Sequence, residues 1–200
     1  KFDPNNIGDK DVIYIGATTS RDVPKIMAIA SQGSSLYIYE ISPEMIQGKK
    51  GTICSGYWEL TPETGLVEGK LPVATSAYFD RMFYYAVGNK IYRADLTRST
   101  PRSYEIYAHP DPSVRITRLK FRSQREDRWD ISGGDEVEAI PYDFVSYLGG
   151  VAEYPDGNCS MLEMKLTAAG EIDKEEGTKD LMVYEFKGFK NVVDFVYAFK

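Results

Sequence analysis

Histidine and cysteine are scarce in this sequence, which has one histidine (His109) and two cysteines (Cys54 and Cys159) among 200 residues. A single histidine excludes a His-rich metal site, and two cysteines are too few for a disulfide scaffold or a structural zinc site. A Ser-His-Asp triad would need His109 itself, and the sequence has no G-x-S-x-G nucleophile elbow. We therefore expect a structural role for His109, two thiols with a single disulfide bridge as the alternative, and no metal or cofactor.

Long apolar runs and basic runs are also missing. No stretch approaches the roughly 20 apolar residues that span a bilayer, so we predict no transmembrane segment. Thirty acidic against 24 basic residues give a net charge of -6, and no basic run follows the pattern that binds a phosphate backbone, which argues against nucleic acid as a partner. Neither a P-loop nor a G-x-G-x-x-G motif occurs. Because the sequence starts at Lys1 rather than Met, we interpret it as a processed or trimmed product.

Apolar and aromatic residues are abundant, at 42% and 13% of the chain, and they recur in a repeated pattern. Three pairs of apolar runs are each joined by a short turn, which reads Gln-Gly, Gly-Asn or Pro-Asp-Gly-Asn. Such turns supply the positive φ that tight hairpins need, so the pattern predicts three β-hairpins of one type. The first runs are KIMAIAS (25–31), RMFYYAV (81–87) and LGGVAEY (148–154), and the second runs are SSLYIYEIS (34–42), NKIYRADLT (89–97) and CSMLEMKLT (159–167).

Two further strands are predicted beside each hairpin. Aromatic outer runs follow the hairpins: TICSGYWEL (52–60), RSYEIYAH (102–109) and DLMVYEFKGF (180–189). Shorter runs come next, VATSAYF (73–79), ITRLKF (116–121) and VVDFVYAF (192–199), and DVIYIGAT (11–18) is the equivalent before the first hairpin. We expect Trp58, in the first outer run, to be a core residue. The charge-dense stretch 168–180 is expected to be a solvated loop.

The spacing of the repeats predicts the architecture. Equivalent positions Leu36, Ile91 and Met161 are 55 and 70 residues apart, and the extra length lies in an insertion between Arg122 and Phe144. Units of roughly 40 to 50 residues that hold four strands are typical of β-propeller blades. We therefore predict an all-β fold, a β-propeller-like array of four-stranded antiparallel blades, with about three blades present and the propeller partial or split.

One domain over residues 1–200 is predicted, with repeats at 11–63, 71–110 and 115–189 and a closing strand at 191–200. A closed propeller has about four to eight blades, so three blades leave the two terminal blade faces uncovered. Large exposed apolar faces are uncommon on a stable monomer. We expect these faces to be covered, with self-association through them as one way of doing so.

The phrases KIMAIASQGSSLYIYEIS, MFYYAVGNKIYRADL and LMVYEFKGFKNVVDFVYAFK resemble the C-terminal part of the PKD-like lipoproteins of Bacteroidetes, in which propeller-like repeats follow immunoglobulin-like domains. The resemblance covers residues 25–200 and rests on structural phrases rather than catalytic motifs. It implies export, a location in the periplasm or at the outer-membrane surface, a lipid-anchored parent protein, and association with glycan-uptake systems. The sequence has neither a lipobox cysteine nor an immunoglobulin-like segment.

The insertion at 122–144 is the leading candidate for a contact surface, since loops on a rigid scaffold commonly carry function. Aromatic rings beside guanidinium and carboxylate groups suit sugar stacking and also protein hot spots, although an aromatic residue in a long loop more often packs against its own blade. The acidic residues of the insertion allow two other readings, a catalytic carboxylate pair and a calcium site. The candidate contact residues are Arg125, Arg128, Trp129, Asp130 and Tyr142.

These observations favour a non-enzymatic protein of the cell envelope, a scaffold that binds a glycan or another envelope protein. The alternative is a carbohydrate-active hydrolase that uses acidic residues of the 122–144 insertion. The scarcity of histidine and the absence of catalytic motifs favour binding, whereas fold alone does not separate the two, because one fold can host both.

Overall fold

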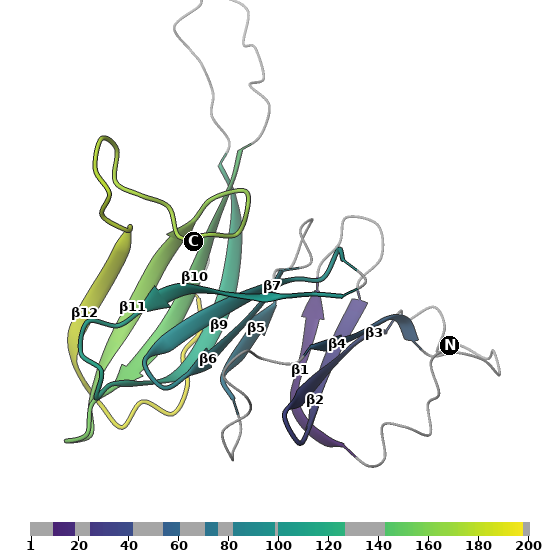
Figure 1. Ribbon diagram of the computed structural model, residues 1–200. Helices are drawn as coiled ribbons and strands as arrows, with labels where there is room; N and C mark the ends of the chain where they lie inside the picture. Colours follow the sequence, from purple (N-terminus) through teal and green to yellow (C-terminus); the bar gives the residue numbers. More distant parts are fainter. Residues whose placement is uncertain are drawn as a thin grey trace, which may run out of the picture.

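The computed structural model describes residues 10–18, 25–41, 54–60, 71–75, 82–98, 100–126 and 143–197. Within these ranges the chain forms twelve β-strands and no helix, which confirms the predicted all-β class. The strands make three four-stranded sheets in which all neighbours are antiparallel (Figure 1). The repetition in the sequence is therefore a repetition of sheets.

Each sheet consists of four consecutive strands, placed side by side in chain order. Sheet A contains β1 (Asp11–Thr18), β2 (Lys25–Gln32), β3 (Ser35–Ile41) and β4 (Cys54–Leu60). Sheet B contains β5 (Val73–Thr75), β6 (Met82–Val87), β7 (Lys90–Asp95) and β8 (Ser103–Ala108). Sheet C contains β9 (Arg115–Glu126), β10 (Asp143–Glu153), β11 (Asn158–Leu166) and β12 (Val183–Lys190).

The central hairpin of every sheet turns at a glycine. Gly33, Gly88 and Gly157 have φ values of 57°, 59° and 80°, which side-chain-bearing residues rarely adopt. The three hairpins predicted from the Gly-containing turns are confirmed.

Sheet B lies between sheets A and C, and Figure 1 shows the three side by side. Successive side chains of a strand point to opposite faces, and β6 illustrates the result. Phe83 and Tyr85 pack in a buried cluster with Leu36 of sheet A. Tyr84, between them, packs with Met164 of sheet C. Both faces of β6 are therefore buried, and each sheet covers an apolar face of its neighbour.

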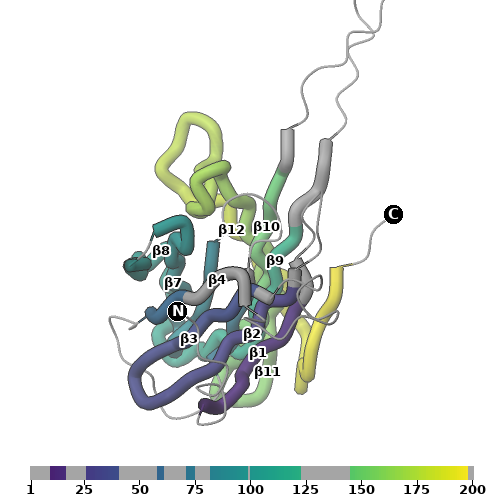
Figure 2. The backbone as a smooth tube through the Cα atoms, turned by 90° about the vertical axis from the view of Figure 1, so that its right-hand side faces the viewer, coloured from purple at the N-terminus to yellow at the C-terminus, as the bar shows by residue number. Residues whose placement is uncertain are grey.

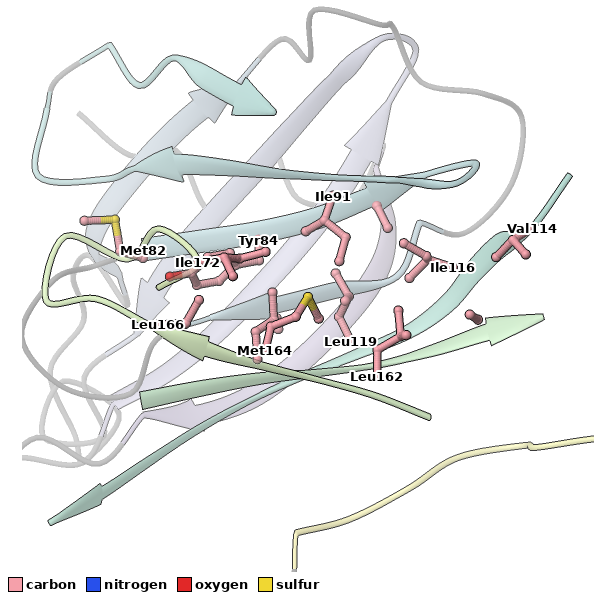
Figure 3. Packing of buried hydrophobic residues seen from close by; sticks show 14 residues of the cluster. Met82, Tyr84, Ile91, Val114, Ile116, Leu119, Leu162, Met164, Leu166 and Ile172 are labelled. Atoms are coloured by element: carbon pink, nitrogen blue, oxygen red, sulfur yellow. The ribbon is translucent and has the colours of Figure 1, made fainter. Parts of the chain in front are cut away.

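Figure 3 shows the cluster between sheets B and C, where Tyr84 and Ile91 face Leu119 and Met164. The cluster between sheets A and B holds Trp58, whose side chain is buried as the sequence predicted. Face-to-face packing of this kind removes apolar surface that a single four-stranded sheet would leave in water.

Side chains at equivalent positions of the three repeats point in the same direction along the stack of sheets. Leu36 faces sheet B, and the equivalent Ile91 faces sheet C. The third equivalent, Met161, precedes Leu162, which packs toward sheet B, so Met161 points to the opposite, outer face of sheet C. That outer face therefore corresponds to the faces of sheets A and B that are covered by the next sheet.

A closing strand was predicted over residues 191–200. Residues 192–197, the C-terminal segment, belong to no strand, and residues 198–200 lie outside the described residues. The segment runs along the outer face of sheet C (Figure 2). Arg118 Nε donates a hydrogen bond of 2.6 Å to the carbonyl oxygen of Val193, and Lys120 Nζ lies 2.9 Å from a carboxylate oxygen of Asp194.

Glycine at position 149 lets the C-terminal segment come close to β10. A Cβ atom added to Gly149 would collide with the hydroxyl of Tyr197 and the ring of Phe195. The guanidinium carbon of Arg122 lies 4.6 Å from the ring centroid of Tyr147 and 4.8 Å from that of Tyr197. The segment is thus held by cation–π contacts and by polar contacts to β9.

Candidate functional site

The contact surface predicted from the sequence lies mostly outside the described residues. This is the case for Arg128, Trp129, Asp130 and Tyr142. Arg125 has its backbone in β9, while its side chain is outside the described part. The acidic residues suggested for catalysis or calcium binding in the insertion are outside it as well, apart from the backbone positions at the ends of β9 and β10. The insertion therefore stays a prediction.

A polar cleft of about 530 Å³ lies at sheet B instead, where the loop of residues 167–182 from sheet C comes close to β7 and β8. Figure 2 shows this loop beside β8. The loop connects β11 to β12, so strands of two sheets position the walls of the cleft. Tyr104 of β8, 48% exposed, provides the aromatic surface of the cleft.

The loop is fixed against sheet B by buried contacts. Ile172 pairs with Leu166 in an isolated β-bridge and is only 5% exposed in the cluster between sheets B and C. Gly170 has a φ of 75°, and its carbonyl oxygen accepts a hydrogen bond of 3.0 Å from the hydroxyl of Tyr84. The sequence predicted a solvated loop here, and residues 173–181 fit that description, but the residues around Ile172 are anchored.

Arg93 of β7 is the central cation of the cleft. Its side chain is 12% exposed and lies 3.7 Å from a carboxylate oxygen of Glu171. One terminal nitrogen donates to the carbonyl oxygen of Ala169, and Nε is buried without a hydrogen-bond partner. The guanidinium carbon is 5.9 Å from the ring centroid of Tyr104. Loop contacts and the tyrosine ring therefore orient this guanidinium group.

The cleft is more positive than the chain as a whole. Four cations, Arg93, Arg98, Arg102 and Lys174, and three carboxylates, Asp95, Glu105 and Glu171, give it a net charge of +1, against -6 for the chain. The carboxylates are engaged: Glu105 pairs with Lys90 at 2.7 Å, Asp95 with Arg98 at 3.8 Å and Glu171 with Arg93. Arg102 and Lys174 make no ion pair with a described residue. These two side chains are available to an anionic ligand.

Asp95, one of the carboxyl groups of the cleft, is a poor candidate for a general acid. Partial burial raises the pKa of Asp95. Hydrogen bonds from Thr97 and the charges of Arg98 and Arg93 together lower it by more, so the net pKa lies below its usual value. A glycosidase acid needs a raised pKa. Elsewhere in the described part, the surroundings likewise lower the pKa of three carboxyl groups: Asp111, Glu185 and Asp194.

Sequence reasoning missed the cleft because it forms only when the loop folds back over β7. One local signal was available. Arg93 lies two residues after Ile91, so it points to the same face as a buried side chain and needs a polar partner there. The glycine at 170, in a run with two alanines before it, marks the turn that brings that partner close.

His109 is placed away from the cleft, packed between the rings of Tyr107 and Tyr154 at centroid distances of 6.4 and 6.0 Å. It is 6% exposed, and its Nε2 lies 3.7 Å from a carboxylate oxygen of Glu185. The hydroxyl of Tyr154 donates a hydrogen bond of 2.7 Å to the same oxygen of Glu185. The side chain lies at the junction of sheets B and C, as a packed structural residue would.

Metal-binding and thiol chemistry find little support in the described part of the chain. No group of three or more His, Cys, Asp or Glu side chains there is arranged to hold a metal ion. Cys159 is a buried free thiol, and the side chain of Cys54 lies outside the described residues.

The described ranges also hold no helix of the length and apolarity that would cross a membrane.

No protein-family model matches this chain, and neither a curated protein nor a solved structure matches it. The residues of the cleft and the arrangement of the sheets are therefore the observations that bear on function.

Proposed function

We propose that this chain is a non-enzymatic binding protein built on propeller-like stacked sheets, and that the cleft between β7, β8 and the loop 167–182 binds an acidic glycan. The observation that carries the proposal is the pair of unengaged cations, Arg102 and Lys174, beside the exposed ring of Tyr104. Guanidinium and ammonium groups bind carboxylates through charge-assisted hydrogen bonds.

A glycan fits this cleft better than a simple anion does. Sugar hydroxyls both donate and accept hydrogen bonds, and the cleft offers carboxylates as acceptors together with cations as donors. A tyrosine ring adds a flat apolar surface with a polar tip, on which the C–H face of a sugar ring can pack. A ligand that combines hydroxyl groups with carboxylate groups would use every kind of group in the cleft.

The propeller-like arrangement is the scaffold part of the proposal. Its support is that four-stranded antiparallel sheets of one order stack face to face in chain sequence, as the blades of a propeller do. A scaffold of stacked sheets holds loops such as 167–182 in fixed positions, which lowers the entropic cost of binding. Export and attachment of the parent protein to the envelope rest on the resemblance to PKD-like lipoproteins and are proposed with it.

The hydrolase alternative receives less support. Where the surroundings shift the pKa of a carboxyl group in the described part of the chain, they lower it, as at Asp95 and Glu185. The acidic residues of the insertion 122–144 lie almost entirely outside the described residues, so the hydrolase alternative stays a prediction.

A glycan array followed by calorimetric titration tests the proposal. We expect retention of carboxylated oligosaccharides and not of their neutral counterparts, with no release of new reducing ends. Replacing both Arg102 and Lys174 by alanine should weaken binding by about tenfold or more, equivalent to about 1.4 kcal/mol. Arg115→Ala, which removes an exposed arginine at the start of β9, is the matched control. Unchanged affinity in the double variant, or cleavage of the bound glycan, would contradict the proposal.

A further inference from the structure

Two of the exposed apolar side chains in the described part line the same cleft. Nine large hydrophobic side chains are exposed there, and seven of them belong to β1, to β12 or to the C-terminal segment. The other two are Tyr104 and Leu181, which are 48% and 38% exposed, and both line the cleft between β7, β8 and the loop 167–182. The cleft therefore has a second apolar contact besides the tyrosine ring.

Leu181 is positioned by backbone pairing within the loop. It pairs with Lys174 in an isolated antiparallel β-bridge. Next to this bridge, the amide of Met182 donates a hydrogen bond of 2.8 Å to the carbonyl oxygen of Asp173. Residues directly opposite each other in an antiparallel pair direct their side chains to the same side. Lys174 and Leu181 therefore belong to one wall of the cleft, which both of them line.

The wall supplied by β8 combines the same two kinds of side chain. Arg102 immediately precedes β8, and Tyr104 is two residues further along, so the two side chains lie on one side of the strand and both line the cleft. Arg102, like Lys174, makes no ion pair with a described residue. Each wall thus presents one exposed apolar side chain beside one unengaged cation. Such walls suit a flat ring that carries an anionic group at its edge.

A sugar ring that packs between two apolar side chains needs C–H groups on both of its faces. In a β-linked pyranose of the gluco configuration all substituents are equatorial, so the hydroxyl and carboxylate groups project from the edge of the ring. In the galacto configuration one hydroxyl is axial and occupies one face. A hydroxyl that is buried against an apolar group without a hydrogen-bond partner costs free energy. Two apolar walls therefore discriminate between the two configurations.

We propose that the cleft selects β-linked uronic acid units of the gluco configuration, with the ring packed between Tyr104 and Leu181 and the carboxylate bound by Arg102 and Lys174. This inference rests on the proposed function, because it takes an acidic glycan as the ligand of the cleft. The three carboxylates of the cleft accept hydrogen bonds from the equatorial hydroxyls. The cleft volume of about 530 Å³ lies within the range of roughly 300 to 1,000 Å³ that small-ligand sites have.

An NMR titration of the full 200-residue chain with two methyl glycosides tests the selectivity. We expect methyl β-D-glucuronide to bind about tenfold more tightly than methyl β-D-galacturonide, which differs from it only in the axial hydroxyl. Leu181→Ala should weaken binding of the glucuronide and bring the two dissociation constants close together, because one apolar wall is lost. Val12→Ala removes an apolar side chain of similar exposure, 46%, on β1. It is the matched control and should keep the full preference.

Three results would overturn the inference, and they separate it from the proposed function. If both uronides bind with equal affinity, or the galacturonide binds more tightly, the cleft binds acidic sugars without selecting the ring. If Leu181→Ala keeps the full preference for the glucuronide, the selectivity does not come from the two apolar walls. If neither uronide shifts the signals of cleft residues, the proposed function fails together with the inference. The same spectra report whether each variant is folded.

Discussion

The hydroxyl of Tyr84, in strand β6 of the middle sheet, donates a buried hydrogen bond to the carbonyl oxygen of Gly170, 86 residues further along the chain. It joins sheet B to the loop 167–182, which is otherwise held by Ile172 and by the contacts of Arg93. The wall of the proposed binding cleft is therefore attached to the most buried sheet. Losing this hydrogen bond should therefore affect both the stability of the fold and the position of the cleft wall.

Tyr84→Phe should lower the free energy of unfolding by about 1 kcal/mol, because the variant loses a buried hydrogen bond. The ring would keep its stacking on Phe121, 6.1 Å away, so packing contributes little to the change. Urea denaturation followed by tryptophan fluorescence measures the difference. Tyr104→Phe, at an exposed ring, is the control and should change stability by less than about 0.5 kcal/mol. Equal losses in the two variants would show that the bond to Gly170 is not what stabilises the loop.

Gly149→Ala should release the C-terminal segment from sheet C. The added methyl group would overlap the hydroxyl of Tyr197 and the ring of Phe195. Limited proteolysis followed by mass spectrometry should then find faster cleavage within residues 192–197. Gly150→Ala is the matched control, since its Cβ would approach no atom closer than 3.4 Å. If both variants are cleaved at the rate of the parent protein, the segment does not depend on the glycine.

Stability in acid should depend on Glu185. Partial burial raises the pKa of Glu185, but the hydroxyls of Ser160 and Tyr154 and the charge of Lys187 lower it more, so the net pKa lies below the usual 4.5. The folded protein then binds fewer protons than the unfolded chain does, and its stability falls as the pH drops below about 4.5 and through the lowered pKa.

Replacing Glu185 by glutamine should flatten this part of the curve of unfolding free energy against pH, measured by urea denaturation. Glu176→Gln, in the exposed part of the loop 167–182, controls for the removal of one carboxylate. A curve that keeps its slope below pH 4.5 in Glu185→Gln would assign the acid sensitivity to other groups.

Much of the fold was predictable from the sequence because its determinants are local. The positive φ at Gly33, Gly88 and Gly157 is a demand of the turn itself, and short apolar runs bounded by turns are typical of buried strands. The spacing of Leu36, Ile91 and Met161 placed the repeats in the right phase. These features do not depend on which sheet packs on which.

The remaining features depend on contacts between distant segments. Residues 192–199 have the pattern of a strand, yet a strand needs a neighbour with which to pair, and the described part of this segment meets the face of sheet C instead of an edge. Predicting the cleft would have required knowing that the side chain of Ile172 is buried while the acidic side chains around it are exposed to water. No periodicity in the loop 167–182 signals this, because a single anchoring residue has none.

The burial of β6 on both faces restricts how this sequence can change over time. Along most strands, every second position faces water or a loop and tolerates many residue types. In β6, Phe83 and Tyr84 are neighbours that serve two different cores, so a polar replacement at either one weakens a different half of the molecule. Sequence variation should therefore accumulate in the outer strands and in the loops, while almost none of the six positions from Met82 to Val87 should tolerate a polar residue.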